Sequence, residues 1–533
     1  MSFNTSHLLA YLGLLAGGAV FYGVAIVVYR VWFHPLAKYP GPFLAKITDG
    51  YQLYHAWKGD RQLEFWRMHQ KYGPVIRFGP NSITFNSNKA LKEIYGFRSN
   101  VRKAEFYDAF VHPTANTHNS RDKEVHARKR RVMSQAFSES AMKEMQRYIL
   151  GNIRTFCEQI GMADGSPDNK GWTQPRKMSD WCNYLAMDIL GDLCFGKAFH
   201  MLESPTNRFA LGLVEAATTR HLLCGTMSIV NKLSLDRFLF PGLAAGRARY
   251  MAYSKSQLTE RTKLGEETDR RDFFYYLLKA RDPETGQGFT TPELWSESNL
   301  LFGSIIAGSD TTSTAMAATL FYLVRCPRAL ERVNEEIRSK FNDVEEICQG
   351  ATLASCTYLR ACIDEAMRMS PSVGGIVPRE VLSGGMTIEG RAIPEGTVVG
   401  VPHYTIHHNE SYYPSPYEYV PERWIAGALN PLTGRKTTEE EVSLAASAFC
   451  PFSIGPRGCI GKGLAYVEMT NTLARTMYLY DMRKAVGIVD PAEGHPNNEW
   501  GRHRPGEMQL RDIFTSAKNG PMVEFRKAAH VSS

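Results

Sequence analysis

The segment from Phe452 to Gly461, Phe-Ser-Ile-Gly-Pro-Arg-Gly-Cys-Ile-Gly, constrains this chain of 533 residues more than any other. Gly455 and Gly461 allow the backbone to turn tightly and to approach a flat object closely. Cys459 stands just before a region with a helical pattern, where the helix dipole and nearby backbone N–H groups favour a thiolate. Arg457 can pair with an anion on the same face. The segment therefore predicts a loop that presents one thiolate, one cation and a glycine surface.

The chain contains ten cysteines, and none of them forms a CxxC pair. This spacing argues against a zinc module and a regular disulfide framework, and it fits a reducing compartment. A free cysteine is most often an inert part of the core, so Cys459 considered without its neighbours would be predicted to be a buried structural residue. Its loop favours a different role, because haem iron can be held by a single cysteine thiolate.

The N-terminus predicts a membrane anchor. No Asp, Glu, Lys or Arg precedes Arg30, and Leu8–Tyr29 is an uncharged run of 22 residues, long enough to span a hydrocarbon core of about 30 Å. Lys38 and Lys46 follow, so the positive-inside rule places the body of the protein in the cytosol. A cleaved signal peptide is the alternative, but it would have basic residues before a shorter apolar run. These features divide the chain into a short lumenal N-terminus (1–7), a transmembrane anchor (8–29), a basic, proline-rich hinge (30–47) and one large domain (48–533).

Hydrophobic periodicity predicts that this domain is mainly α with a small β subdomain, an α+β fold class. Val75–Gly79 and Ser82–Asn86 alternate apolar and polar residues on either side of a turn, which predicts a β-hairpin. Helical patterns dominate from about residue 88 to 370. The remaining predictions are a helix at 178–196, strands within 373–402, a Pro- and Tyr-rich coil from 402 to 455, and a helix from about Gly463.

One long helix is predicted from about 292 to 326, with a capping box formed by Thr290 and Glu293. Gly308 and Thr311 lie near its middle. Glycine inside a helix costs about 1 kcal/mol relative to alanine, and threonine can bond back to a carbonyl one turn earlier and bend the helix. We therefore expect the helix to open locally at these two residues.

Four separated motifs occur in order: Ala307-Gly-Ser-Asp-Thr-Thr312, Glu365-Ala-Met-Arg368, Pro421-Glu-Arg-Trp424 and the Cys459 loop. With the anchor and the proline hinge, the chain resembles the microsomal type of haem-thiolate cytochrome P-450 monooxygenase over essentially its whole length. The stretch from Val377 to Trp424 resembles filamentous-fungal members of secondary-metabolite pathways. The resemblance implies the cytochrome P-450 fold in a single catalytic domain, and heme b (iron protoporphyrin IX) with Cys459 as the axial ligand of the iron.

The resemblance also implies roles for residues around the haem. Asp310 and Thr311 would be the acid–alcohol pair that delivers protons for oxygen activation. His126 stands where the family often has Trp, and its ring N–H can still donate to a haem propionate. The other positions that match propionate-binding or haem-contacting residues are Arg130, Ala307, Gly308, Arg379, Phe452, Gly455, Arg457 and Gly461.

Two groups of charged residues receive structural or docking roles. By resemblance, Glu365, Arg368 and Arg423 form a buried network that holds the cysteine loop, although an ExxR pair alone usually marks a solvated helix face. Three further basic residues, Arg128, Lys129 and Arg131, are expected to face outward. They would then either form a solvated face or dock an acidic reductase.

Substrate contacts are expected, by family position, from 106–120, 302–306, 373–377 and 514–516. These stretches are apolar with few hydroxyl groups, which predicts a hydrophobic small-molecule substrate. The net charge of +8 is not gathered into one basic run, which argues against nucleic acid. The resemblance implies a single-pass protein of the endoplasmic reticulum membrane with a cytosolic catalytic domain. NADPH–cytochrome P-450 reductase would supply its electrons, with cytochrome b5 as a further donor.

The expected activity is the insertion of one oxygen atom from O2 into that substrate, as a tailoring step in the biosynthesis of a polyketide, terpenoid or alkaloid type of secondary metabolite. The same oxidant can also perform phenol coupling or desaturation, and the sequence leaves these alternatives open. A redox-independent isomerase or dehydratase on the same fold usually lacks the acid–alcohol pair, and a haem-binding sensor would not need it. Asp310 and Thr311 are both present.

Overall fold

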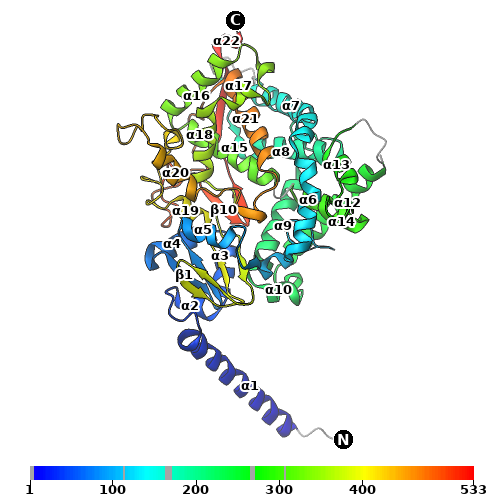
Figure 1. The fold of residues 1–533 in the computed structure, drawn as a ribbon, viewed down its shortest axis with the longest axis vertical. Helices are drawn as coiled ribbons and strands as arrows, with labels where there is room; N and C mark the ends of the chain where they lie inside the picture. The colour runs from blue at the N-terminus through cyan, green and yellow to red at the C-terminus, as the bar shows by residue number, and fades with distance from the viewer. Residues whose placement is uncertain (1–4, 112–113, 163–170, 264–269, 305–307, 533) are drawn as a thin grey trace.

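The computed structural model describes residues 5–111, 114–162, 171–263, 270–304 and 308–532 (Figure 1). Helix α1 (Thr5–Val28) and the short π-helix that continues it (Tyr29–Phe33) project away from the body. The section Tyr11–Phe33 has a mean hydropathy of 2.0 and none of it is buried, so its length and composition suit a membrane crossing. The helical segment begins before residue 8 and continues past residue 29.

The proline-rich hinge packs on the domain instead of standing free of it. Leu36 is fully buried. The backbone N–H of Arg77 donates to the carbonyl of Pro40 at 2.7 Å, and the Arg77 guanidinium donates to the carbonyl of Arg30 at 2.7 Å. A side chain at Gly41 would place its Cβ 2.1 Å from the carbonyl oxygen of Arg77, so only glycine allows this close approach. The anchor therefore leaves the body in a defined direction.

The largest sheet has five strands in the order β1 (Val75–Gly79), β2 (Ser82–Phe85), β8 (Val398–Gly400), β5 (Arg379–Val381) and β3 (Val101–Lys103). Strands β2 and β8 are parallel, and the other pairs are antiparallel. Val75 lies opposite Phe85, which confirms the predicted hairpin. The smaller sheets are the pair β6 (Met386–Ile388) and β7 (Arg391–Ile393), the pair β10 (Leu510–Ile513) and β11 (Thr515–Lys518), and the trio β4 (Arg176–Lys177), β12 (Met522–Lys527) and β9 (Tyr480–Lys484).

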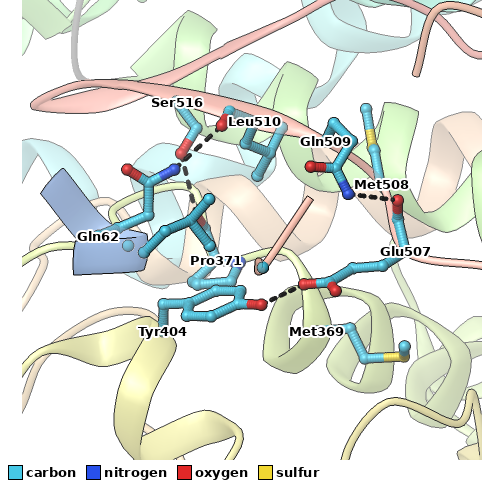
Figure 2. Close-up of a pocket in the computed structure, with 12 residues that line it drawn as sticks. Gln62, Met369, Pro371, Tyr404, Glu507, Met508, Gln509, Leu510 and Ser516 are labelled. Atoms are coloured by element: carbon cyan, nitrogen blue, oxygen red, sulfur yellow. Dashed lines mark hydrogen bonds between the residues drawn. The ribbon is translucent and has the colours of Figure 1, made fainter. Parts of the chain in front are cut away.

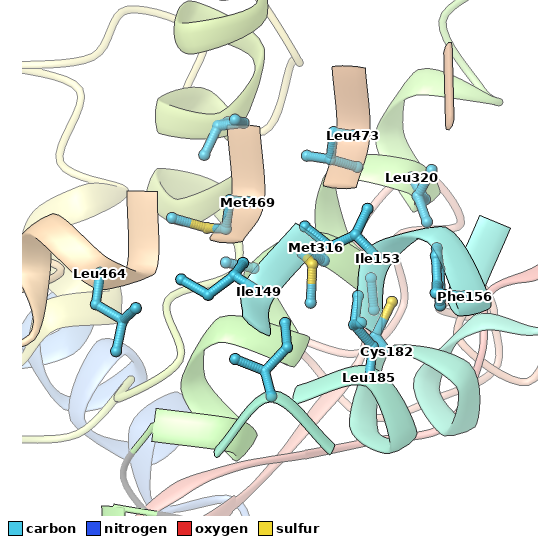
Figure 3. Close-up of a cluster of buried hydrophobic side chains, with 14 of the residues drawn as sticks. Ile149, Ile153, Phe156, Cys182, Leu185, Met316, Leu320, Leu464, Met469 and Leu473 are labelled. Carbon is cyan, nitrogen blue, oxygen red and sulfur yellow. The ribbon is translucent and has the colours of Figure 1, made fainter. Parts of the chain in front are cut away.

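Four long helices surround the main hydrophobic core: α7 (Glu139–Gly161), α8 (Met178–Phe195), α15 (Asp310–Leu323) and α21 (Lys462–Leu479). Each buries an apolar stripe with helical spacing. Figure 3 shows the stripes meeting at Ile149, Ile153, Phe156, Cys182, Leu185, Met316, Leu320, Leu464, Met469 and Leu473, all buried. Side chains at these positions fix α15 and α21 relative to each other.

The remaining helices complete the body around this core. They are α2 (Phe43–Ile47), α3 (Gly50–Lys58), α4 (Arg61–Tyr72), α5 (Asn88–Tyr95), α6 (Lys123–Ser134), α9 (Phe209–Thr226), α10 (Ser228–Lys232), α11 (Asp236–Leu239), α12 (Pro241–Lys263), α13 (Phe273–Lys279), α14 (Thr291–Ser304), α16 (Pro327–Lys340), α17 (Ala351–Ala354), α18 (Thr357–Met369), α19 (His403–His407), α20 (Glu439–Ala448) and α22 (Ala529–Ser532). The short 3-10 helices are η2 (Glu105–Phe110), η3 (Gln135–Phe137), η6 (Val344–Glu346), η7 (Pro421–Trp424) and η8 (Gly455–Arg457). The architecture confirms the predicted α+β class.

Two predictions about individual elements need correction. The helix predicted from 292 to 326 is described as two helices: α14 starts with the predicted capping box, and α15 begins at Asp310 and ends at Leu323. Residues 308 and 309 have π geometry, which agrees with the expected local opening at Gly308, and residues 305–307 lie outside the described residues. The prediction of coil from 402 to 455 is also wrong, because helix α20 forms within this range. It begins with a second capping box, made by Thr438 and Glu441.

Candidate active site

A cavity lies between α6, α15, α21 and the strands β3 and β5. Its empty space, together with the part that is open to solvent, is about 1570 Å³. It is lined by most of the predicted site residues: His126, Arg130, Gly308, Thr311, Arg379, Phe452, Arg457, Cys459 and Gly461. Gly455 and Asp310 do not line it, and Ala307 lies outside the described residues. The cavity is therefore where the sequence-predicted residues converge.

The loop that carries Cys459 is fixed by its own backbone. The N–H of Cys459 donates to the carbonyl of Phe452 at 2.8 Å, and the N–H of Gly458 donates to that of Gly455 at 2.9 Å. Gly455 has φ +69°, and a Cβ there would lie 2.0 Å from the carbonyl oxygen of Tyr95. A glycine at this position is therefore required by both conformation and space.

Cys459 lines the cavity, and its surface is exposed there. Burial raises the pKa of its thiol, while the backbone N–H groups of Gly461 and Lys462 and the charges of Arg130 and Lys462 act in the opposite direction. These N–H groups and charges therefore favour a thiolate, as expected, but without a metal they do not outweigh burial. A bound metal cation would reverse the balance, since a coordinating thiol loses its proton.

The start of α15 forms a second wall of the cavity. The hydroxyl of Thr311 donates to the carbonyl of Gly308 at 3.5 Å, and the carbonyl of Thr311 accepts from Ser372 at 2.8 Å. Burial raises the pKa of the neighbouring Asp310 carboxyl, and Lys518 and the hydroxyl of Thr515 act against this increase. Thr311 therefore lines the cavity, whereas the Asp310 carboxyl is held on the side of β11 by Thr515.

Basic side chains gather along another part of the cavity wall: Lys103, His126, Arg130, Arg379 and Arg457. Burial, followed by the charges of Arg379, Arg457 and Arg130, holds the pKa of Lys103 well below its usual range. Burial and the charge of Arg457 lower the pKa of His126 to about 2, and burial and Arg379 lower that of Arg457 to about 10.

Among the described lining residues the only carboxyl belongs to Glu468, whose pKa burial raises to about 8. This wall of the cavity therefore has an excess of positive charge that an anion would stabilise.

Glu365, Arg368 and Arg423 form the predicted buried network. Both oxygens of Glu365 accept from Arg368 at 2.9 Å, and one also accepts from Arg423 at 2.9 Å. The indole of Trp424 and the N–H of Val420 add bonds of 2.9 and 3.1 Å. Burial alone would raise the pKa of Glu365, but Arg368 and Arg423 outweigh it and lower that pKa to about 2.

This network reaches the cysteine loop through His407. Arg368 donates to the carbonyls of His407 at 2.9 Å and Pro416 at 2.8 Å. The imidazole of His407 then accepts the backbone N–H of Cys450 at 3.0 Å, directly before the loop that carries Cys459. The sequence did not indicate this connection, because it depends on the packing of α19 under α18.

The basic residues of α6 do not form the solvated face or the docking surface for an acidic reductase that the sequence suggested. Lys129 is buried and lies 3.1 Å from Glu293 and 3.2 Å from Glu297. Arg128 also pairs with Glu293, and Arg131 lies 2.7 Å from Asp282 and 2.8 Å from Glu284. The prediction that Lys129 faces outward is therefore wrong, since acidic residues from 282 to 297 neutralise this face within the chain.

Three of the predicted substrate-contacting stretches reach the cavity. They contribute Tyr107, Thr117, His118, Val373, Val377, Phe514 and Thr515. The ring of Phe514, at the turn between β10 and β11, lies 5.6 Å from that of Phe106 and 6.1 Å from that of His118. Residues 112, 113, 305 and 306 of the predicted stretches lie outside the described residues. The lining on this side is aromatic and mostly apolar.

The sequence did not indicate three features of the cavity wall. They are Lys103, His403 and the pairing of Tyr107 with Arg379. Lys103 ends β3, and its ammonium donates to the carbonyl of His118. Tyr107 bonds to Arg379 and therefore joins the basic cluster from η2. His403, in α19, lines the cavity beside them. A lysine at the end of a three-residue strand carries no sequence signal, because only the pairing of β3 with β5 places it beside Arg379.

A second, smaller hollow of about 310 Å³ lies between α4, α19 and the segment 507–516 (Figure 2). Its polar groups bond to one another: Gln62 donates to the carbonyl of Leu510 at 3.0 Å, and Tyr404 donates to Glu507. Ser516 donates to the carbonyl of Pro371 at 3.1 Å. These bonds attach the β10–β11 hairpin to α4 and to Pro371, and they attach Glu507 to α19, so the hollow lies where these elements pack together.

Comparison with known proteins gives a consistent result. A family model described as Cytochrome P450 matches residues 40–497. The chain is 39% identical to cytochrome P450 monooxygenase AKT7 of Alternaria alternata over 518 residues, which cover 97% of each chain. It is 39% identical over 506 residues to cytochrome P450 monooxygenase poxM of Penicillium oxalicum, covering 95% of this chain and 93% of the relative. It is 38% identical over 529 residues to cytochrome P450 monooxygenase atnE of Emericella nidulans, covering 98% of each chain.

Proposed function

Because the chain belongs to the cytochrome P450 family of haem-thiolate monooxygenases, we propose that Cys459 is its axial ligand to haem iron. The proposed reaction inserts one atom of O2 into a hydrophobic small molecule and reduces the other to water, using two electrons and two protons. The observation that carries this proposal is that Cys459, Thr311 and the basic cluster all line one cavity.

The residues present fit haem. Three arginines, Arg130, Arg379 and Arg457, line the cavity, and Glu468 is the one carboxyl among the described lining residues, so the two propionates of haem would supply negative charge beside the arginines. The sulfur of Cys459 is reachable from the cavity.

The residues around the cavity then have distinct roles in the proposed reaction. When bound, haem supplies the iron that activates O2. Arg130, Arg379 and Arg457 hold the propionates, and the backbone N–H groups of Gly461 and Lys462 stabilise negative charge on the Cys459 sulfur. Thr311 presents its hydroxyl to the cavity, and Asp310 behind it exchanges protons with the interior of the protein. An isomerase or dehydratase would have no need of this pair.

The substrate is hydrophobic and carries an aromatic or other flat apolar part. Tyr107 and Phe514 form the wall that such a group would meet, and Val373 and Val377 extend it. The filamentous-fungal relatives and the resemblance at 377–424 support a tailoring step in secondary-metabolite biosynthesis.

We place the protein in the endoplasmic reticulum membrane, with α1 as a single crossing and the domain in the cytosol. Apolar side chains near the anchor support this placement: Phe43, Leu44, Leu233 and Phe238 are 58%, 59%, 61% and 82% exposed. They belong to α2 and to the region of α10 and α11, at the same end of the molecule as α1 (Figure 1). Resistance to carbonate extraction, and digestion of the domain by protease added to intact microsomes, would check both parts.

Electrons would come from NADPH–cytochrome P450 reductase, with cytochrome b5 as a second donor. Since acidic residues from 282 to 297 neutralise the basic face of α6, we infer that the donor docks elsewhere. Lys462, the first residue of α21, lies over the ring of Phe452 and is exposed next to the cysteine loop. An acidic donor that docked there would have a short path to Cys459.

The proposal is tested by supplying isotopically labelled O2 to microsomes that contain the protein and the reductase, with a library of flat apolar compounds. The expected product gains one labelled oxygen atom and requires NADPH. A product that forms without label would indicate coupling or desaturation, and a product that forms without NADPH would indicate an isomerase or dehydratase.

A further inference from the structure

His118 lines the aromatic side of the cavity, and its ring is held there by other rings. The imidazole centre lies 5.6 Å from that of Tyr107, 5.4 Å from that of Phe110 and 6.1 Å from that of Phe514. Each of the three pairs is edge-on, with interplanar angles of 69°, 63° and 73°. Edge-to-face contacts favour a defined ring orientation. The imidazole is therefore oriented by packing.

The loop that carries His118 is fastened on both sides of this residue. The backbone N–H of Thr117 donates to the buried carboxylate of Glu297 at 2.9 Å. The side-chain amide of Asn119 donates to the carbonyl of Phe110, also at 2.9 Å. A group that is held in place before a ligand arrives loses little conformational freedom on binding. The position of His118 therefore suits the selection of one ligand over another.

The backbone of His118 is hydrogen-bonded, but its imidazole is not. The N–H donates to the side-chain oxygen of Asn116 at 3.1 Å, and the carbonyl accepts from the ammonium of Lys103. Within the part of the chain that the structure describes, neither ring nitrogen has a hydrogen-bond partner. A polar group in an apolar wall selects for a ligand that supplies the missing bond, because any other ligand would displace water and leave the group unpaired.

The charges around His118 favour an acceptor over a donor. Burial holds the pKa of the imidazole well below its usual range, and Lys103, His221 and Arg379 lower it further. The ring is therefore neutral near pH 7 and carries one N–H and one lone pair. The guanidinium of Arg379 keeps its positive charge at this pH. An oxygen that is negative, or partly negative, is consequently the more favourable partner for the ring N–H.

We propose that His118 is a specificity-determining residue, whose ring N–H donates to an oxygen acceptor at one end of a flat apolar substrate. The acceptor is a carboxylate or a carbonyl, and the apolar body lies against Tyr107 and Phe514. This inference rests on the proposed function, because it narrows the class of substrate for the same cavity.

The test uses three naphthalene probes that differ in one substituent at the same ring position: naphthoate, acetylnaphthalene and methylnaphthalene. The first carries an anionic acceptor, the second a neutral acceptor and the third none. Equilibrium dialysis with the haem-loaded protein gives a dissociation constant for each probe. The quantity compared is the preference for an acceptor, which is the constant of the methyl probe divided by that of each acceptor probe. His118→Phe keeps an aromatic ring without the N–H, whereas His118→Gln keeps an N–H donor.

We expect wild type to prefer both acceptor probes. In His118→Phe the preference should fall about 10- to 100-fold for naphthoate and about 2- to 10-fold for acetylnaphthalene, the ranges of charged and neutral hydrogen bonds. His118→Gln should recover part of it. His221→Phe is the matched control, because His221 stacks on Phe110 at 4.6 Å and is not among the described lining residues. It should keep the preference of wild type.

An unchanged preference in His118→Phe would overturn the inference, even if that variant had lost haem. An equal decrease in His221→Phe would also overturn it, because the effect would then come from packing. Failure of every probe to bind wild type at up to about 1 mM would contradict the substrate class. The carbon monoxide spectrum of the same wild-type preparation tests the proposed function separately. Without a thiolate-type band that function fails, whereas the dialysis result still decides the role of His118.

Discussion

Replacing Glu365 with Gln should destabilise the folded protein and release haem, without any contact between this residue and the cavity. The pKa of Glu365 is lowered from 4.5 to about 2. The carboxylate therefore contributes about 3 kcal/mol above pH 4.5, a contribution that is lost as the pH falls towards 2. Removing one partner of a buried ion pair independently suggests about 3–5 kcal/mol, because Arg368 and Arg423 would remain buried without a counter-charge.

For 533 residues, a loss of about 3 kcal/mol corresponds to a decrease of about 3 °C in the melting midpoint. The assay is thermal unfolding, together with the haem retained after gel filtration. We expect Glu365→Gln to lose haem, because Arg368 also holds His407 and, through it, the start of the cysteine loop.

Glu345→Gln is the matched control. Glu345 also receives two arginines, Arg154 and Arg475, and its pKa is also lowered to about 2. However, half of its side chain is exposed, so solvent screens the pair and we expect a loss of at most about 1 kcal/mol. Equal losses for the two variants would refute the argument that burial decides the cost.

Three further predictions concern the cavity. Thr311→Ala should lower product formation at least about tenfold while NADPH oxidation continues and peroxide accumulates, because the threonine hydroxyl is gone. If the amount of product per NADPH stayed unchanged, Thr311 would have no role in proton delivery. Arg457→Leu should weaken haem binding about 10- to 100-fold, the value of one charge-assisted hydrogen bond, as measured by haem transfer to an acceptor protein; unchanged transfer would place the propionates elsewhere. Glu468→Gln should change the pH dependence of stability. With a pKa raised to about 8, the folded protein keeps a proton on Glu468 that the unfolded chain releases above pH 4.5. Wild-type stability therefore falls by up to about 1.4 kcal/mol per pH unit between pH 5 and 8 from this group, and the Gln variant should lack that slope. Parallel melting curves for the two proteins across this range would contradict the prediction.

Local signals predicted much of the fold. The turn at 79–81 and the alternation around it predicted the β1–β2 hairpin, which forms with Val75 opposite Phe85. The capping box at Thr290 and Glu293 predicted the start of α14. A similar box at Thr438 and Glu441 would have indicated α20, but the prolines and tyrosines around it suggested coil. Short-range hydrogen bonds of this kind are visible in sequence because both partners lie within one turn.

Long-range pairings were not visible in the sequence. Lys103 joins Arg379 only because β3 pairs with β5 across nearly 280 positions of the chain. Lys129 appeared to belong to a solvated basic face, and the sequence did not show that Glu297 would pack against it. The local opening of the helix before Asp310 was predicted, but the side on which its carboxyl lies depends on Thr515, which is some 200 residues away.

The central claim, that Cys459 holds haem iron in the cavity, is tested most directly by the carbon monoxide difference spectrum of the reduced protein. Wild type should show the red-shifted Soret band of a thiolate-ligated haem, and Cys459→Ser should lose it. Cys450→Ser, a buried cysteine nine residues earlier, should keep the band. A band of the histidine-ligated type in wild type, or the same thiolate band in Cys459→Ser, would contradict the account of this site.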